Sequence, residues 1–273
     1  MFIKRTLAFF CVIAMGVTMT ACKKSEAKEI NSPDDFSGAK IAVQTATTAS
    51  ESIAELNKDK KIKISEYEKI TQCFDDLELD RVDAVYVDSV VAAYYTTGST
   101  KYKRTWLSDV AEPMAICMRK DSADLAAAVE AAVDTLYYNG KMAEIAKTHF
   151  GSDFTPVRTV TEEPTLPDFK LPGGVFKVGM EVGYPPMEYT EKDGVTYKGF
   201  DVDVAKAIAE LLGGQAQFVN TAWDGIFASL DKGEYDAIIS AVSINDERDA
   251  KYLLTKPYIA NALCIVQKIN DKK

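Results

Sequence analysis

Histidine and cysteine are scarce in this 273-residue chain, and its 32 basic residues are outnumbered by 41 acidic ones. Each of these features narrows the possible functions. The single histidine, His149, has no nucleophile or ligand pair spaced around it, which argues against a histidine-based catalyst. The five cysteines do not follow the spacing of a metal site. A net charge of −9 argues against nucleic acid and anionic membrane surfaces as partners. We therefore expect no metal, no cofactor and no nucleic-acid partner.

Residues 1–21 are typical of a signal peptide and not of a folded element. Lys4 and Arg5 form a positive start, and residues 7–17 form an apolar run that is too short to span a bilayer comfortably. We expect the protein to be exported.

The segment Met19-Thr20-Ala21-Cys22 resembles the lipobox of bacterial lipoproteins. The resemblance implies cleavage before Cys22 and a lipid on that cysteine. The polar residues 22–33 would then form a tether to the membrane. An ordinary secretory signal with a chance cysteine, or an uncleaved anchor, remains the alternative.

Three cysteines remain in the mature chain, at positions 73, 117 and 264. Cys117 and Cys264 lie in apolar, strand-like runs, so we expect both to be buried thiols. One disulfide among the three stays open.

The composition, with 47% hydrophobic and 27% charged residues, is that of a globular protein with one large domain or two of ordinary size. Apolar runs that read as strands alternate with amphipathic segments that read as helices, which predicts an α/β fold. The expected strands are 39–44, 61–67, 82–87, 112–119, 175–181, 215–220, 235–239 and 258–266.

A proline-rich stretch over 151–173 divides the chain. It has no hydrophobic period and is long for a connection inside a compact domain. A weak repeat supports two similar units, because residues 77–84 parallel residues 230–237, each with a helix end, a turn and the start of a buried strand. Two such units that face each other would enclose a cleft.

The stretch SAVSINDER, residues 240–248, follows the strand at 235–239. Ser243 could cap a helix there, with Asp246 completing a capping box. Arg248 would then lie in the first turn, where a bound anion would offset its conflict with the helix dipole. The alternative, equally weighted from this stretch alone, is that Arg248 reaches back to Asp246, Glu247 or another surface acid.

Polar groups also follow two strands of the first unit. Thr45, Thr47 and Thr48 come after the strand at 39–44 and could cap a helix. Asp88 follows the strand at 82–87, where α/β sheets place ligands. A helix N-cap is the commoner role for such an aspartate, and both roles can coexist.

Several motifs together resemble the first lobe of bacterial polar-amino-acid-binding proteins, the solute-binding partners of ABC importers. They are GYPPMEY, KGFDVDVAKAIAELLG, WDGIFASLDKGEYDAIISAVSINDER and TKPY. The segments DFSGAKIAVQTATTAS, VDAVYVDSVVA and NGKMAEIAKTHFG resemble the second lobe and the closing helices. The resemblance implies the type II periplasmic-binding-protein fold: two α/β lobes, each a mixed sheet flanked by helices, with the ligand cleft between them.

The order of the lobes departs from the family, because the lobe that usually comes first comes last here. The chain resembles a circular permutant with a signal peptide over 1–21 and a tether over 22–33. The usual second lobe then spans 34–117, closing helices span 118–150, a linker spans 151–173 and the usual first lobe spans 174–268. We expect the new ends to be exposed and close together. We also expect one interlobe crossing, near 112–118, to stay covalent while the free ends replace the other.

The resemblance implies a role for each residue of the cleft. Arg248 would pair with the α-carboxylate of an amino acid, shared by Thr48 and the backbone after Thr47, and Asp88 would accept from the α-ammonium. Further candidates are Ser240 and Ser243 for hydrogen bonds, Ala241 where some relatives have a second serine, Gln44, and Tyr184 with Trp223 as an aromatic pair around the ligand side chain.

Glu181 bears on specificity, because it stands where cation-binding relatives carry an acid. An acid beside two aromatic rings suits arginine or lysine. The alternative is a structural ion pair of Glu181 with Lys177 or Lys198 and a neutral ligand such as glutamine or cystine.

We therefore expect an extracytoplasmic, lipid-anchored, monomeric binding protein that delivers an amino acid to an ABC permease, and not an enzyme. One alternative is a dehydratase of the cyclohexadienyl type, for which the cleft could offer Glu181, Asp88 or Tyr184 as acid or base. A ligand sensor on the same fold is another alternative.

Overall fold

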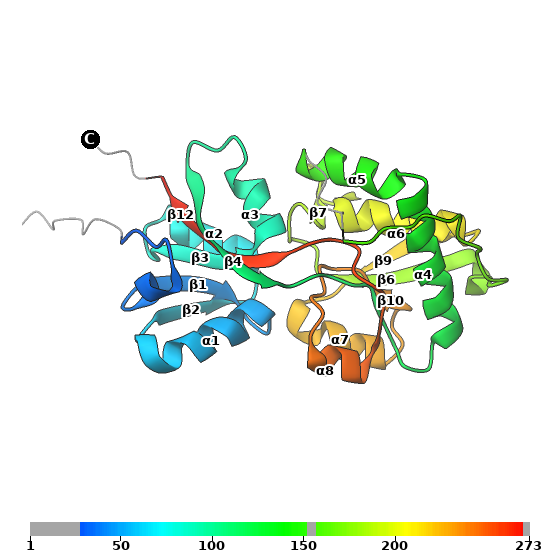
Figure 1. The fold of residues 1–273 in the computed structure, drawn as a ribbon, viewed down its shortest axis with the longest axis horizontal. Coiled ribbons are helices and arrows are strands. Elements are labelled where there is room, and N and C mark those ends of the chain that lie inside the picture. Colours follow the sequence, from blue (N-terminus) through cyan, green and yellow to red (C-terminus); the bar gives the residue numbers. More distant parts are fainter. Residues whose placement is uncertain (1–27, 152–156, 270–273) are drawn as a thin grey trace, which may run out of the picture.

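The computed structural model describes residues 28–151 and 157–269, which form two lobes, each built on a five-stranded sheet (Figure 1). The predicted signal peptide, Cys22 and most of the predicted tether lie outside the described residues. No helix within the described ranges is long and apolar enough to cross a membrane.

The first lobe has the strand order β2-β1-β3-β12-β4. Strands β1 to β3 are parallel, and β12 runs antiparallel to β3 and β4. Its elements are η1 (Pro33–Phe36), β1 (Lys40–Gln44), α1 (Thr48–Lys60), β2 (Lys63–Tyr67), α2 (Ile70–Glu78), β3 (Ala84–Asp88), α3 (Ser89–Thr96), β4 (Tyr102–Ala111) and β12 (Ala262–Lys268).

The second lobe has the order β11-β5-β10-β6-β9, with β10 and β9 parallel to β6. Its strands are β5 (Cys117–Met118), β6 (Val175–Met180), β9 (Gln215–Asn220), β10 (Ala237–Ile238) and β11 (Leu253–Leu254), with a small hairpin of β7 (Tyr189–Thr190) and β8 (Tyr197–Lys198). Its helical elements are α4 (Ala123–Tyr138), α5 (Lys141–Phe150), η2 (Pro172–Gly174), α6 (Phe200–Leu211), α7 (Trp223–Asp231) and α8 (Asp246–Lys251).

The apolar runs of the sequence become the central strands. In each of β1 and β3, all residues but one are buried, as expected for parallel strands that helices cover on both faces. Helix α4 buries Val129, Val133 and Leu136, and α6 buries Val204 and Ile208. The expected two-lobe α/β architecture is confirmed.

The chain crosses between the lobes twice, and both crossings are covalent, which corrects the expectation of a single covalent crossing. Residues 112–116 lead into the second lobe and residues 255–261 lead back, where β12 joins the first sheet beside β4 (Figure 1). The two crossings are hydrogen-bonded, with Glu112 N donating to Asn261 O at 2.8 Å and Tyr258 N to Met114 O at 2.9 Å.

The expected second-unit range of 174–268 is corrected for the same reason. The apolar run at 258–266 predicts one strand, but its first residues belong to the crossing and the rest to β12, which lies in the sheet of the other lobe. Apolar character does not reveal where a run changes sheets.

The two ends of the described chain lie together at the first lobe. The Gln267 side chain accepts from Ile30 N and donates to Lys28 O, both at 2.8 Å. Ile30 is fully buried there.

The described part of the proline-rich linker packs on the second lobe. Leu171 is buried in the core, and Leu166 and Phe169 pack against it. Arg158 donates to Glu130 and Asp134 of α4.

Cys73, Cys117 and Cys264 are buried free thiols, so the expectation for Cys117 and Cys264 is confirmed and no disulfide joins the three. Burial raises the pKa of Cys73 and of Cys117 to about 12. Such thiols are unreactive near neutral pH.

Candidate functional site

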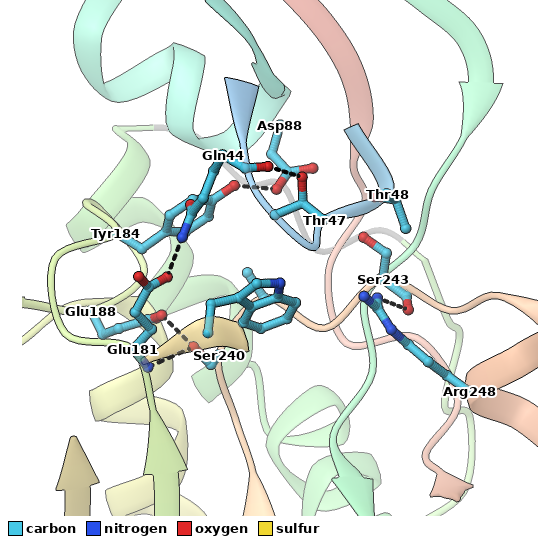
Figure 2. A pocket seen from close by; sticks show the side chains of 12 residues that line it. Gln44, Thr47, Thr48, Asp88, Glu181, Tyr184, Glu188, Ser240, Ser243 and Arg248 are labelled. Atoms are coloured by element: carbon cyan, nitrogen blue, oxygen red, sulfur yellow. Dashed lines mark hydrogen bonds between the residues drawn. The ribbon is translucent and has the colours of Figure 1, made fainter. Parts of the chain in front are cut away.

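A pocket lies between the lobes, where β1, β3 and α1 face β6, α7 and α8 (Figure 2). The empty space among its lining atoms is about 320 Å³, and this figure includes space that is open to solvent. All the candidate residues from the sequence line it, together with Glu188, which the sequence reasoning missed. They are Gln44, Thr47, Thr48, Asp88, Glu181, Tyr184, Glu188, Trp223, Ser240, Ala241, Ser243 and Arg248.

Arg248 enters the pocket from the first turn of α8, as predicted. Its Nη1 donates to Ser243 O at 2.8 Å, and its guanidinium lies over the rings of Trp223 and Phe227, at 5.5 and 5.1 Å. It does not reach back to Asp246 or Glu247. Burial lowers the pKa of Arg248, and the neighbouring acids oppose that shift.

The cap of α8 differs from the prediction. Asn245, and not Ser243, is the N-cap, and its side chain accepts from Arg248 N at 2.8 Å. Ser243 is held extended instead, because it forms an antiparallel bridge with Met114. The predicted capping box at Ser243 and Asp246 is therefore wrong, and the helix begins at Asp246, two residues later than a cap at Ser243 implies.

The start of α1 brings two threonines to the opposite wall. Thr47 is the N-cap, and its hydroxyl accepts from Ser50 N at 3.1 Å. The Thr48 hydroxyl donates to Glu112 Oε2 at 2.9 Å. Burial and the nearby Asp88 carboxylate raise the pKa of Glu112 to about 7.

Asp88 closes the pocket at the end of β3. It accepts from the Tyr184 hydroxyl of the other lobe (Figure 2). It also accepts from the Asn261 amide of the second crossing. Asp88 is the N-cap residue of α3, but its side chain makes no capping bond, and Asn261 Oδ1 accepts from Ser89 N at 2.9 Å instead. The carboxylate of Asp88 is thus turned into the cleft. Burial raises its pKa, while these two donors and Arg248 lower it.

Glu181 and Gln44 meet across the cleft, with Gln44 Nε2 donating to Glu181 Oε2 at 2.7 Å (Figure 2). Gln44 Nε2 also donates to Glu68 O at 3.1 Å, and its Oε1 is buried without a partner among the described residues. Burial raises the pKa of Glu181 to about 7, and Gln44 partly offsets that shift. The alternative pairing of Glu181 with Lys177 or Lys198 is not formed, since Lys198 pairs with Glu191 at 3.4 Å.

The loop at residues 240–243 forms the floor. Ser240 Oγ accepts from Glu181 N at 3.0 Å and donates to Glu188 Oε1 at 2.6 Å. Ala241 has a left-handed φ of 48° and donates its N–H to Asp201 Oδ2 at 2.8 Å. Three other stretches of the second lobe, at Glu181, Glu188 and Asp201, thus meet at this loop.

The charges of the pocket are segregated. A buried guanidinium stands at one end, while the carboxyl groups of Asp88 and Glu181 come from opposite lobes (Figure 2). Trp223 also joins the lobes, because its Nε1 donates to Ala46 O at 2.7 Å. Such a site can hold a small molecule that carries both a carboxylate and cationic groups.

Comparison with known proteins covers one part of the chain. Residues 176–273 match the family of bacterial extracellular solute-binding proteins, family 3. That segment contains Glu181, Tyr184, Trp223, Arg248 and the loop at 240–243. The match therefore includes the second-lobe wall of the pocket.

Three relatives align over similar lengths. An L-cystine-binding protein, TcyJ of Escherichia coli (strain K12), is 40% identical over 99 residues, which are 36% of this chain and 37% of that protein. The ABC transporter arginine-binding protein 1 of the same strain is 34% identical over 35% of this chain and 39% of its own. A cyclohexadienyl dehydratase of Pseudomonas aeruginosa is 35% identical over 33% of each chain. The alignments thus span less than two fifths of the length of these relatives.

Proposed function

We propose that this protein is an extracytoplasmic solute-binding protein that captures an amino acid between its lobes and delivers it to an ABC importer. The observation that carries the proposal is the pair Arg248 and Asp88, which line one enclosed pocket from opposite lobes. One N–H of the Arg248 guanidinium donates to Ser243 O. Its other N–H groups can donate two parallel hydrogen bonds to a ligand carboxylate. Asp88 can accept from an α-ammonium in place of the Tyr184 hydroxyl.

We further propose that the ligand is arginine or lysine. Glu181 and the unpartnered Gln44 Oε1 are two acceptors at the same point of the wall, near Tyr184 and Trp223. A guanidinium or ammonium offers donors to both acceptors and can lie against aromatic rings. A neutral polar ligand is the alternative, and the similarity to the L-cystine-binding protein is the observation that favours it.

The lipid anchor, the monomeric state and the partner permease are proposals of the same kind. The lipobox-like Met19-Thr20-Ala21-Cys22 supports the anchor. The names of the relatives as ABC transporter binding proteins support the permease. A sensor would use the same pocket, and a permease gene beside this one would favour transport.

We also propose that the chain is a circular permutant of the family. The family match covers residues 176–273, which include most strands of the second lobe and β12, while the motifs that resemble the other lobe lie earlier in the sequence. A sequential alignment can follow only one of two segments whose order has been exchanged. The proximity of Gln267 to Lys28 and Ile30 supports a former junction there.

The test is a thermal-shift and calorimetric screen of the exported chain against the common amino acids and cystine. A ligand at one hundred times its dissociation constant adds about 2.7 kcal/mol to the free energy of unfolding. Arginine or lysine should give the largest shift. Arg248→Ala should remove every shift, whereas Arg81→Ala, at an exposed ion pair, should leave all of them.

The other results of the screen are equally informative. A preference for cystine or glutamine would refute the basic-ligand proposal and leave the binding function intact. Turnover of a prephenate-like acid would identify an enzyme. An absence of any shift would contradict amino-acid binding itself.

A further inference from the structure

Glu188 in the pocket lining and Asp201 next to the loop at 240–243 are two acids without a basic partner in the described part of the chain. Glu188 and Asp201 are both 0% exposed, and neither forms a salt bridge within the described residues. Isolated buried carboxylates are costly, so each such group requires a specific explanation.

Gly199 brings the two acids together. Its φ is 139°, and a Cβ at this position would lie 2.1 Å from Met187 O and 2.9 Å from Glu188 Cα. This close approach lets Asp201 N donate to Met187 O at 2.9 Å. The first turn of α6 is thereby seated on the backbone that carries Glu188.

The two carboxyl groups have unequal hydrogen bonding. Asp201 accepts from the Tyr258 hydroxyl at 2.7 Å and from Ala241 N at 2.8 Å, so each of its oxygens has a donor. Glu188 Oε1 accepts from the Ser240 hydroxyl at 2.6 Å. Glu188 Oε2 is buried and has no donor in the described part of the chain.

The surroundings of the pair disfavour two negative charges. Glu181 faces it from the end of β6, and Tyr184 and Tyr258 add only hydroxyls. His149 of α5, a basic group whose charge acts on Asp201, is itself paired with Asp203 at 2.7 Å. Burial raises the pKa of Glu188 well above its ordinary value, and the negative Asp201 raises it further. Burial also raises the pKa of Asp201, but its donors oppose that shift.

We propose that Glu188 is a protonated positioning residue, whose Oε2–H donates to the Asp201 carboxylate beneath the pocket. The proton lets Glu188 Oε2 form a hydrogen bond. Asp201 stays ionised and also accepts from the Tyr258 hydroxyl and from Ala241 N. The neutral acid and the carboxylate then act as one unit with a single negative charge.

This unit fixes the floor of the ligand pocket. Glu188 orients the Ser240 hydroxyl, so that Ser240 Oγ can accept from Glu181 N. Asp201 holds Ala241 in its left-handed conformation. The shape of the loop at 240–243 therefore depends on which of the two acids carries the proton. The consequence for ligand affinity rests on the function proposed above, whereas the protonation state does not.

The two isosteric amide variants should behave differently. In Glu188→Gln, the amide group can donate to Asp201 while its carbonyl accepts from Ser240, so the melting temperature should stay within about 2 °C of wild type at pH 6. In Asp201→Asn, one oxygen becomes a donor that faces either Tyr258 or Ala241 N–H. An unsatisfied buried group of this kind should lower the melting temperature by about 3–10 °C and weaken amino-acid binding about 10-fold or more. Glu191→Gln, at an exposed pair on the β7–β8 hairpin, is the control and should change neither quantity.

The titration of the unmutated protein gives a second readout that needs no ligand and no variant fold. In ¹³C NMR of the protein labelled at its glutamate side-chain carboxyls, one resonance should keep the chemical shift of a protonated carboxyl above pH 7. That resonance should be absent from the Glu188→Gln variant. If Glu188 stays protonated in the folded state, the free energy of unfolding should fall as pH rises above about 4.5, because the unfolded chain then releases this proton. Glu188→Gln should make the free energy of unfolding less dependent on pH in that range.

Specific results would overturn the proposal. One is a Glu188 resonance that titrates near its ordinary pKa. Another is a reversal in which Asp201→Asn is tolerated and Glu188→Gln is not. If the titration is as expected but no amino acid binds, the proton assignment stands and the proposed function fails.

Discussion

Gln44 Nε2 lies 2.7 Å from Glu181 Oε2, and this hydrogen bond joins the end of β1 in one lobe to the end of β6 in the other. The Tyr184 hydroxyl donates to Asp88 across the same cleft, and Trp223 Nε1 donates to Ala46 O. The residues that we propose to bind the ligand are therefore the same residues that hold the lobes together. A ligand would have to replace some of these bonds, so its affinity reflects the difference between the two sets of contacts.

The pH dependence of binding should report the charge of the ligand side chain. Burial raises the pKa of Glu181 to about 7, and a cationic side chain would favour the ionised form. Binding of arginine at pH 6 should therefore release a proton, and its affinity should rise by up to about 10-fold between pH 6 and pH 8. Calorimetry in two buffers of different ionisation enthalpy measures that proton.

Glu181→Gln is the matching variant. It should remove the proton release and weaken arginine binding by about 10- to 100-fold, because a charge-assisted bond is lost. Glutamine binding should change only a few-fold. An unchanged ratio of arginine to glutamine affinity would refute the role of Glu181 in specificity.

Glu181 should also make stability depend on pH in a known direction. Its folded pKa of about 7 lies above the ordinary value of about 4.3, so its contribution is present in acid and is lost as pH rises from about 4.5 through 7. The loss should amount to at most about 4 kcal/mol. Urea unfolding of the protein without added amino acid, at pH 5 and pH 8, measures it. If the free energy of unfolding of Glu181→Gln changes with pH as much as that of wild type, the effect comes from other acids such as Glu112.

Arg248→Lys tests the geometry of the carboxylate site as distinct from its charge. Lysine keeps the charge but lacks the planar fork that can pair bidentately and stack on Trp223 and Phe227. We expect amino-acid affinity to fall about 10- to 100-fold with little change in ligand preference. Calorimetry with the preferred ligand measures the loss, and wild-type affinity would show that charge alone suffices.

The residues that line the pocket could be predicted from the sequence because they stand at positions that local sequence patterns identify. Thr47, Asp88, Ser240 and Arg248 all stand at strand ends or helix starts, where α/β folds place ligands. Their order along the chain and the family resemblance were then enough to bring them to one site.

The missed residues depend on contacts between distant parts of the chain. Asn261 binds Ser89, 172 positions away, and Glu112 accepts from Thr48, 64 positions away. Glu188 lies in the motif GYPPMEY, but its burial beside Asp201 follows from the close approach of the Gly199 backbone to Met187 and Glu188. The second crossing was missed because hydrophobic patterning does not show which sheet a strand joins.

Arg158 should be the main attachment of the linker to the second lobe. Its side chain is 6% exposed, donates to Asp134 at 2.6 Å and to Glu130 at 3.0 Å, and lies 5.3 Å from the Tyr137 ring centre. Arg158→Ala leaves two carboxylates whose remaining salt-bridge partner, within the described ranges, is the exposed Lys256.

We expect Arg158→Ala to lower the free energy of unfolding by about 1–3 kcal/mol. Arg81→Ala removes an exposed pair and should cost about 0.5 kcal/mol or less. Denaturant unfolding compares the two variants. An equal loss of unfolding free energy in the two variants would mean that the linker is held to the second lobe by its apolar residues alone.

Restoring the proposed ancestral order is the sharpest test of the permutation. A chain that runs from Val157 to Ile269, continues through a short Gly/Ser linker into Lys28 and ends at Gly151 keeps Arg158 and both interlobe crossings. The new linker is short because Gln267 already contacts Lys28 and Ile30, and short flexible loops close at little entropic cost. We expect the same circular dichroism spectrum and an amino-acid affinity within about 3-fold of the parent. A control opened between Asp236 and Ala237, inside the buried sheet, should not fold. Failure of the first rearrangement to fold would show that the connection through 152–156 is required, and the chain would then not be a simple permutant.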